Sequence, residues 1–316
     1  MKNKWKKLGK IFSSNQFDFL NQFTHTQCPT YLKVHDKHRV YFSSRDQNNK
    51  SMIFFVTLSF ENETLFISDN KLNGPILMQG KSKEFDSDGV MPSYFYQRDT
   101  DLILYYTGWK LSNKYPYENS IGIAISKDYG NTFRKYNHNP VIKKDKINTF
   151  FTGTSCVLKI NDKYINYYMS CYDWVNDKKN NTLEPIYDLK IATSNDGINW
   201  ECSGKTAIKL MPGWGGISKA SILKIGDFFH MWFSYRKITD YRYNEKKSYK
   251  IGYAKSKDGY QWKLDDIIFE EPDQSENGDQ TMQAYPNVFE INKNIFMLYN
   301  GNEFGKTGVF LAKMIA

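Results

Sequence analysis

Long apolar segments and paired cysteines are missing from this sequence, and their absence narrows the class of protein. None of its 316 residues belongs to a run of 18 apolar residues, so no membrane-spanning helix is predicted. The segment MKNKWKKLGKIFSSNQ lacks the unbroken apolar core of a secretory signal, which predicts a soluble, cytoplasmic protein. Cys28, Cys156, Cys171 and Cys202 form no CxxC pair, so we expect buried free thiols and neither a zinc site nor a disulfide framework.

Signatures of cofactor and nucleic-acid binding are also missing. The sequence has no nucleotide-binding glycine-rich loop, His-Cys metal cluster or nucleophile elbow, so no cofactor or metal site is expected. A single cation held by scattered oxygen ligands stays open, because such a site leaves no signature. The net charge of +9 comes from 43 basic residues scattered among 34 acidic ones, which indicates a solvated surface and no nucleic-acid partner. The oligomeric state is left open.

The sequence does contain a repeated pair of β-prone segments. The pairs begin at residues 29, 92, 154, 220 and 286, so successive starts differ by 63, 62, 66 and 66 residues. Each pair has a strand, a polar turn and an aromatic-rich strand, as in TSCVLKINDKYINYYMSC from Thr154. This pattern predicts five β-hairpins at a nearly constant spacing.

Each of the middle three hairpins is followed by an aliphatic strand, an Asp-Gly turn and an aromatic strand. The turns SKDYGNTF, SNDGINW and SKDGYQW place Asp128, Asp196 and Asp258 between the third and fourth strands of a unit, where they are expected to be structural. A four-stranded sheet becomes stable when neighbouring sheets cover both of its faces. We therefore predict an all-β fold, a single five-bladed β-propeller over residues 1–316 with four antiparallel strands per blade.

The last unit lacks an outer strand, because GVFLAKMIA runs directly to Ala316. The segment WKKLGKIF from Trp5 matches WKLDDIIF from Trp262 in its aromatic, basic and apolar positions. Residues 4–12 are therefore predicted to pair with the C-terminal strand and to close the ring, leaving no open sheet edge. The alternative is a basic amphipathic helix on a membrane surface, but closure explains both ends of the chain.

The segments that begin and end the hairpins are predicted to surround one mouth of the propeller. Their aromatic faces and bidentate hydrogen-bonding groups suit a carbohydrate. The candidate substrate-binding residues are Gln27, Arg45, Asp46, Trp109, Asp173, Trp174, Lys219, Tyr235, Arg236, Tyr285, Asn300 and Glu303.

Several of these candidates have an alternative role. Lys219, Arg45 and Arg236 could recognise a carboxylate or phosphate on the glycan, whereas each arginine could equally form a salt bridge between blades. Trp109, Trp174 and Tyr235 could form stacking platforms or belong to the core.

A series of motifs along the chain resembles a group of five-bladed glycosidase-like proteins that are often found in bacterial surface-polysaccharide loci. In chain order, the motifs are HxQxPT, YFSSRD, DxxGVMPS, YYTGW, PYxNxIGxAIS, MWFSYR, YKIGYAKS and YNGNxFGKTG. That group is similar in fold to glycoside hydrolase families 43, 32 and 68. SKDYGNTF resembles the Asp-box turn of sialidases. The resemblance spans about residues 24–314 and implies a carbohydrate ligand and acidic residues at the starts of the blades.

Glycoside hydrolysis needs two carboxyl groups across the scissile bond, and Asp88 and Asp279 are the predicted pair. Both precede inner strands of blades that would flank the first blade, where His25 could carry a proton or hydrogen-bond a hydroxyl. The alternative is that both acids are solvated or form turns. The sequence departs from the related hydrolases, because its first blade offers His25 and Gln27 without a carboxylate and its fourth offers GISK without a glutamate.

Three functions stay open on these residues. The favoured hypothesis is a glycan-active enzyme that cleaves or transfers a glycosidic bond in an intracellular or lipid-linked saccharide. Asp88→Asn or Asp279→Asn would then abolish turnover and leave binding nearly intact. The alternatives are a catalytically inactive carbohydrate-binding propeller in polysaccharide biosynthesis and a protein-interaction scaffold, which would need an exposed apolar patch.

Overall fold

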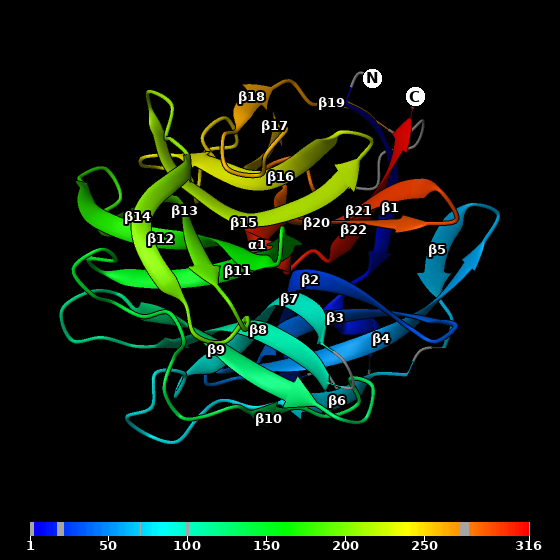
Figure 1. The fold of residues 1–316 in the computed structure, drawn as a ribbon, viewed down its shortest axis with the longest axis horizontal. Coiled ribbons are helices and arrows are strands. Elements are labelled where there is room, and N and C mark those ends of the chain that lie inside the picture. The colour runs from blue at the N-terminus through cyan, green and yellow to red at the C-terminus, as the bar shows by residue number, and fades with distance from the viewer. Residues whose placement is uncertain (1–2, 18–21, 70, 99–100, 272–277, 316) are drawn as a thin grey trace.

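The secondary structure consists almost entirely of strands, which confirms the predicted all-β class (Figure 1). The computed structural model describes residues 3–17, 22–69, 71–98, 101–271 and 278–315, so both ends of the predicted 1–316 domain lie outside the described residues. The elements are β1 (Lys4–Phe12), η1 (Ser14–Gln16), β2 (Thr24–Val34), β3 (Lys37–Arg45), β4 (Ser51–Glu61), β5 (Thr64–Ile67), β6 (Asn73–Leu77), β7 (Gly89–Arg98), β8 (Asp101–Lys110), β9 (Glu118–Ser126), β10 (Arg134–Lys135), β11 (Phe151–Ile160), β12 (Lys163–Asp177), β13 (Thr182–Ser194), β14 (Glu201–Ile208), β15 (Trp214–Ile225), β16 (Phe228–Lys237), β17 (Lys250–Ser256), β18 (Lys263–Asp265), β19 (Ile268–Glu270), β20 (Ala284–Ile291), β21 (Asn294–Asn300), α1 (Asn302–Gly305) and β22 (Val309–Ile315).

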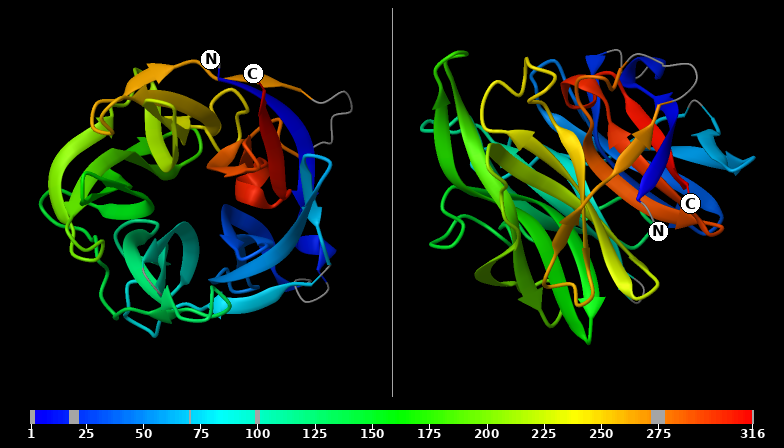
Figure 2. Two further views of the ribbon diagram at one scale, coloured as in Figure 1. Left: turned by 45° about the vertical axis from the view of Figure 1, so that its right-hand side comes forward. Right: turned by 90° about the horizontal axis from the view of Figure 1, so that it is seen from above.

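The strands pair in successive units that lie around a common centre (Figure 2). The predicted hairpins are the antiparallel pairs β2–β3, β7–β8, β11–β12, β15–β16 and β20–β21, which confirms them. A third strand then pairs with the second strand in each unit; these third strands are β4, β9, β13, β17 and β22. The outer strands β10, β14 and β18 complete the middle units, whereas both β5 and β6 pair with β4.

The N-terminal segment is a strand in the same sheet as the C-terminal strand. β1 pairs antiparallel with β22, with Trp5 opposite Met314. The Trp5 ring is completely buried and meets the Trp232 ring edge to face, with the ring centres 5.6 Å apart. Residues 4–12 therefore do not form the alternative amphipathic helix. β19, which sequence reasoning did not predict, pairs parallel with the other edge of β1.

The Asp-Gly turns lie where they were predicted and also join neighbouring units. Asp196 accepts the backbone N–H groups of Ile198 and Asn199 at 2.8 Å each, which confirms its structural role in the turn.

The carbonyl of Gly197 accepts the hydroxyl of Tyr105, which belongs to the preceding unit. The same contact recurs from Tyr41 to Gly130 and from Tyr167 to Gly259. Each turn is thus a contact between units.

Apolar clusters fill the spaces between adjacent units. One joins the first and last units through Phe42, Phe54 and Leu298, and another joins the third and fourth through Ile165 and Phe233. Burial of one phenylalanine or leucine contributes about 1.5–3 kcal/mol, so these clusters hold the inner strands in fixed positions. The cysteines are free, with three buried and Cys202 half-buried. Across the described ranges, no helix has the length and apolar character needed to span a membrane.

Candidate functional site

A cavity of about 390 Å³ lies at the ends of the inner strands, and aromatic and basic residues make up about half of its wall. Its aromatic members come from four units, and its basic members are His25, Arg45 and Arg242. Within the described part of the chain, no aspartate or glutamate lines it. The wall consists of His25, Gln27, Cys28, Arg45, Asn49, Met91, Thr107, Trp109, Leu111, Pro116, Tyr117, Asn119, Thr154, Met169, Tyr187, Ser218, Tyr241, Arg242, Tyr249, Tyr285 and Phe304.

Bulges in the inner strands lie beside this cavity, and three of the bulged residues, Cys28, Thr154 and Tyr285, line its wall. Cys28, Thr154, Lys219 and Tyr285 have left-handed backbone angles, with φ of 57°, 42°, 50° and 57°. Each lies at a register shift between an inner strand and its partner. A bulge re-aims a side chain at the expense of a ladder hydrogen bond, and strained backbone of this kind gathers at functional sites.

Arg45 lies at the end of β3 and contacts only neutral groups. Its Nη2 donates to Gln27 Oε1 at 3.2 Å and its Nη1 donates to Asn49 Oδ1 at 3.0 Å. The guanidinium carbon lies 5.8 Å from the ring centre of Trp109, whose Nε1 is fixed by a bond to Ser51 Oγ. The buried Nε of Arg45 has no hydrogen-bond partner in the described structure. Burial lowers the pKa of this guanidinium from its ordinary value.

His25 is neutral at physiological pH. Burial, followed by the nearby charge of Arg45, lowers the pKa of the imidazole to about 4. Its Nδ1 lies 2.8 Å from Thr24 Oγ1. A neutral imidazole can hydrogen-bond a hydroxyl but is a weak proton donor at pH 7. The lowered pKa therefore favours the second of the two predicted roles for His25.

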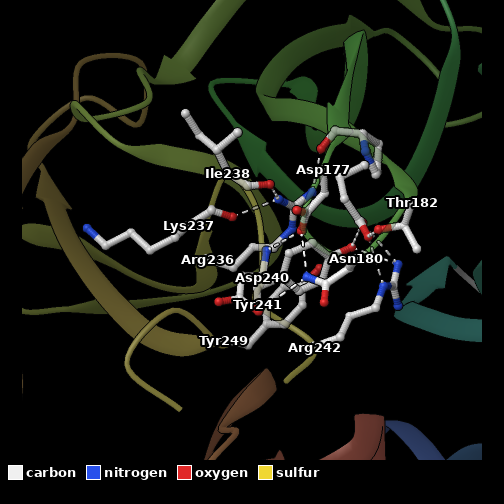
Figure 3. A network of polar contacts seen from close by, with 12 residues as sticks. Asp177, Asn180, Thr182, Arg236, Lys237, Ile238, Asp240, Tyr241, Arg242 and Tyr249 are labelled. Carbon is white, nitrogen blue, oxygen red and sulfur yellow. Dashed lines mark hydrogen bonds and ion pairs between the residues drawn. The ribbon is translucent and has the colours of Figure 1, made fainter. Parts of the chain in front are cut away.

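On the opposite side of the cavity, Arg242 is neutralised by a carboxylate. Its Nε and Nη2 lie 3.2 and 3.3 Å from Glu184 Oε1 and Oε2, and the hydroxyl of Tyr241 also donates to Oε2. Glu184 is buried, whereas 34% of the Arg242 side chain is exposed, so the pair lies at the boundary between the interior and the cavity. Figure 3 shows Arg242 and Tyr241 among a group of residues that make polar contacts.

The same group includes Arg236 as an internal support. Arg236 is completely buried and donates to the carbonyls of Pro185, Lys237 and Ile238 and to the hydroxyl of Tyr187. Because these neutral acceptors bind all three of its nitrogens, Arg236 holds the wall in place and does not itself face the cavity.

A long hairpin brings these residues to the cavity. β12 and β13 continue past the inner-strand ends as far as the pair Asp177 and Thr182. Asp177 Oδ2 accepts the backbone N–H of Asp240 at 2.7 Å, and Asn180 Nδ2 donates to Asp240 Oδ1 at 3.2 Å (Figure 3). The loop between β16 and β17, which carries Tyr241 and Arg242, is therefore fixed by the neighbouring unit.

The structure brings some of the predicted site residues together and separates others. His25, Gln27, Arg45, Trp109 and Tyr285 line the cavity. The candidates outside its wall are Asp46, Asp88, Asp173, Trp174, Lys219, Tyr235, Arg236, Asp279, Asn300 and Glu303.

Asp279 is an internal anchor between strands. It is buried, accepts the hydroxyl of Tyr299 at 2.8 Å and lies 3.0 Å from Lys7 Nζ on β1. The second unit repeats this arrangement with Asp86, Tyr106 and Lys135, and in the third unit Asn148 accepts the hydroxyl of Tyr168. A contact that recurs in equivalent units indicates a structural role. The predicted pairing of Asp279 with Asp88 across the cavity is therefore not what the geometry favours.

Asp88 lies beside the rim. Its Oδ2 accepts the backbone N–H of Leu111, a residue of the cavity wall, at 2.8 Å, and Lys50 Nζ is 3.9 Å from Oδ1.

The other predicted acids make local contacts: Asp46 caps its own turn, Asp173 accepts the N–H of Trp174, and Glu303 pairs with Lys306 on the surface.

The remaining candidates contact other protein groups outside the cavity wall. Asn300 is buried and bridges the backbone of β2, accepting from Cys28 N and donating to Thr26 O. Lys219 is buried and donates to the carbonyl of Ser93. Trp174 stacks on Tyr115 and Tyr235 on Trp214, with ring centres 5.2 and 4.0 Å apart.

Sequence reasoning missed the wall formed by Tyr117, Tyr187, Tyr241, Tyr249, Arg242 and Phe304. Tyr241 and Arg242 directly precede a stretch that has the composition of a solvent loop, so local composition conceals them. As for metal ions, the described ranges hold no cluster of three or more His, Cys, Asp or Glu side chains that could bind one.

Comparison with solved structures defines the class of this fold. A glycoside hydrolase covers 98% of this chain and 91% of its own, with 16% identity and a TM-score of 0.72. A thermostable family-43 glycoside hydrolase gives 14% identity and 0.64, covering 92% and 88%. The Bombyx mori GH32 beta-fructofuranosidase gives 14% and 0.62, covering 94% and 63%. At such low identity the likeness shows the fold alone, which is a propeller of the glycoside hydrolase type.

Two bacterial sequences show the family. The uncharacterized proteins MT1551 and Rv1502, from two strains of Mycobacterium tuberculosis, are each 30% identical to this chain over 315 residues. The match covers 98% of this chain and 98% of each relative. The chain therefore belongs to the same family as these mycobacterial proteins. No family model matches it.

Proposed function

We propose that this chain is a carbohydrate-binding protein built as a single five-bladed propeller whose last blade is closed by β1. The antiparallel units support the blade count, and the lysine contacts support closure. Lys7 of β1 meets Asp279 as Lys135 of the outer strand β10 meets Asp86, so β1 occupies an outer-strand position. We further propose that the protein acts in the cytoplasm and takes part in surface-polysaccharide metabolism, the second of which the sequence resemblance implies.

The observation that carries the binding function is the composition of the cavity wall. Tyrosine and tryptophan rings offer flat faces to the C–H groups of a sugar, while Gln27, Asn49 and Asn119 offer paired amide donors and acceptors. Cleavage of a glycosidic bond needs two carboxyl groups about 5–10 Å apart around the bond. The described wall contains none. A site that holds a saccharide without cleaving it fits this wall best.

An oligosaccharide array tests the proposal. We expect Tyr117→Ala, within the cavity, to weaken glycan binding about 10-fold, because the substitution removes an aromatic contact surface. The matched control is Tyr136→Ala, at an exposed tyrosine outside the cavity, which should bind like the wild type. Equal loss in both variants, or the absence of any binding to the array by the wild-type protein, would contradict the proposal.

The second candidate is glycoside cleavage or transfer, and the place of Asp88 beside the rim is the observation that favours it. In this case mass spectrometry would detect products from bound oligosaccharides, and Asp88→Asn would abolish them. On the binding model, Asp88→Asn leaves both glycan affinity and the absence of product unchanged. Asp279→Asn should lower stability by about 1–3 kcal/mol with no effect on affinity, because it weakens a buried charged contact.

A further inference from the structure

Arg45 places an uncompensated positive charge on the cavity wall. Its two hydrogen-bond acceptors, Gln27 and Asn49, are neutral amides, and its Nε–H is buried without an acceptor. Among the described residues, no carboxylate lies within ion-pair distance of this guanidinium. A partly desolvated charge left in this state is costly, and a ligand with an opposite charge would recover the lost energy.

The groups around Arg45 do not supply a negative charge. His25 is neutral at pH 7, and burial raises the pKa of the Cys28 thiol to about 12, so neither is an anion. Burial likewise raises the pKa of Tyr285 well above its ordinary value. Glu303 lies close enough to His25 to influence it, but this carboxylate is paired with Lys306. The side of the cavity formed by β2 and β3 is therefore positive.

The other side of the cavity adds no excess negative charge. Arg236, Arg242 and Lys219 lie on or directly behind the wall, and Glu184 is the one carboxylate that pairs with them in the described structure. Several positive charges against one negative charge give the enclosed space a positive potential, which concentrates anions.

We propose that Arg45 is the recognition site for an anionic substituent, a carboxylate or a phosphate, on the saccharide held in this cavity; the inference rests on the proposed binding function. A guanidinium presents a planar fork that matches two oxygens of either group. Gln27 and Asn49 hold the fork from two sides, and the Trp109 ring covers one face. The ligand class is thus an acidic glycan.

Matched oligosaccharide sets provide the test. Each set holds a neutral oligosaccharide, the same chain with a uronic acid in place of one sugar, and the same chain with one phosphate ester. We expect the wild-type protein to bind at least one acidic member about 10-fold or more tightly than its neutral counterpart. The carboxylate and phosphate arms then show which anion is preferred.

Two variants assign the effect to Arg45. Arg45→Gln should abolish the preference for acidic members while changing the affinity for neutral ones less than about threefold. Arg134→Gln, which removes the same charge from an exposed position on β10, should retain the full preference. Arg45→Lys keeps the charge but not the fork, and should retain a reduced preference.

The outcomes separate the inference from the proposed function. Equal wild-type binding of neutral and acidic members overturns the acidic-glycan inference and leaves carbohydrate binding in place. Binding of no member by a folded wild-type protein overturns both. Should Arg45→Gln fail to fold, the wild-type protein decides the question, because sodium chloride should weaken binding of the acidic members and leave that of the neutral ones nearly unchanged.

Discussion

The two sides of the cavity differ in whether the charge of an arginine is neutralised by a carboxylate. Arg242, which is fixed by the long β12–β13 hairpin, meets the buried Glu184 and Tyr241. Arg45, at the end of β3, meets only neutral groups, and its hydrogen-bond acceptors are Gln27 and Asn49. The Arg242 guanidinium is neutralised by a carboxylate of the protein itself and supports the wall. The Arg45 guanidinium has no such partner, so its charge is available to a ligand. The contrast separates the structural arginine from the recognition arginine.

Among these predictions, removing the carboxylate that neutralises Arg242 should have the largest effect, which is a loss of stability. Glu184→Gln removes the buried carboxylate that binds Arg242 and the buried hydroxyl of Tyr241, so we expect the free energy of unfolding to fall by about 2–3 kcal/mol. Urea denaturation measures the change. Glu118→Gln is the control, since Glu118 and Lys110 form a partly exposed pair at 3.7 Å, and its loss should be below about 1 kcal/mol. Similar losses in the two variants would show that the contacts of Glu184 stabilise the fold no more than a partly exposed ion pair does.

Placing a carboxylate beside Arg45, so that both sides of the cavity hold a neutralised arginine, should have an intermediate effect, which is on ligand affinity. Gln27→Glu is nearly isosteric and would place a carboxylate beside Arg45 Nη2, where the amide oxygen now lies at 3.2 Å. The internal ion pair should reduce the affinity for acidic oligosaccharides about 10-fold and spare neutral ones. Calorimetric titration of both ligand types gives the ratio, with the exposed Gln261→Glu as control. An unchanged ratio would refute the role assigned to the open Arg45 side.

The smallest effect should be a pH dependence of stability that comes from His25, because burial and the nearby charge of Arg45 lower its pKa. In the native protein this pKa is about 4, against about 6.5 in the unfolded chain. Between these values the unfolded chain binds a proton that the native state excludes, so stability decreases as the pH falls from 6.5 to 4. We expect His25→Gln to lose about 1–2 kcal/mol less than the wild type across this window, allowing for solvent screening. Parallel pH profiles of urea unfolding would contradict this.

Features that repeat along the chain were predictable from the sequence. The hairpins and the Asp-Gly turns depend on neighbouring residues, and a polar turn between two aromatic strands forms the same structure each time it occurs. The matching pattern at Trp5 and Trp262 likewise predicted that residues 4–12 form a strand beside β22. His25, Gln27, Arg45 and Tyr285 were found because strand ends are positions that the repeat itself defines.

Residues whose role depends on a distant partner were not predictable in this way. Asp279 looks like a candidate catalytic acid in its local sequence, yet Lys7, from the opposite end of the chain, and Tyr299 bind it internally. Arg242 directly precedes a stretch of ordinary polar composition, and it reaches the cavity because Asp177 holds the loop between β16 and β17 in place. Arg236 could not be told from Arg45 by sequence, since both end a hairpin.

The sequence by itself determined the strands, their order and the repeated turns, because these follow from side-chain alternation and from short-range hydrogen bonds. Only the tertiary structure decided which charges are satisfied within the protein and which are left for a ligand. Charge compensation depends on distances between side chains that the fold brings together from separate units, and no local pattern contains those distances.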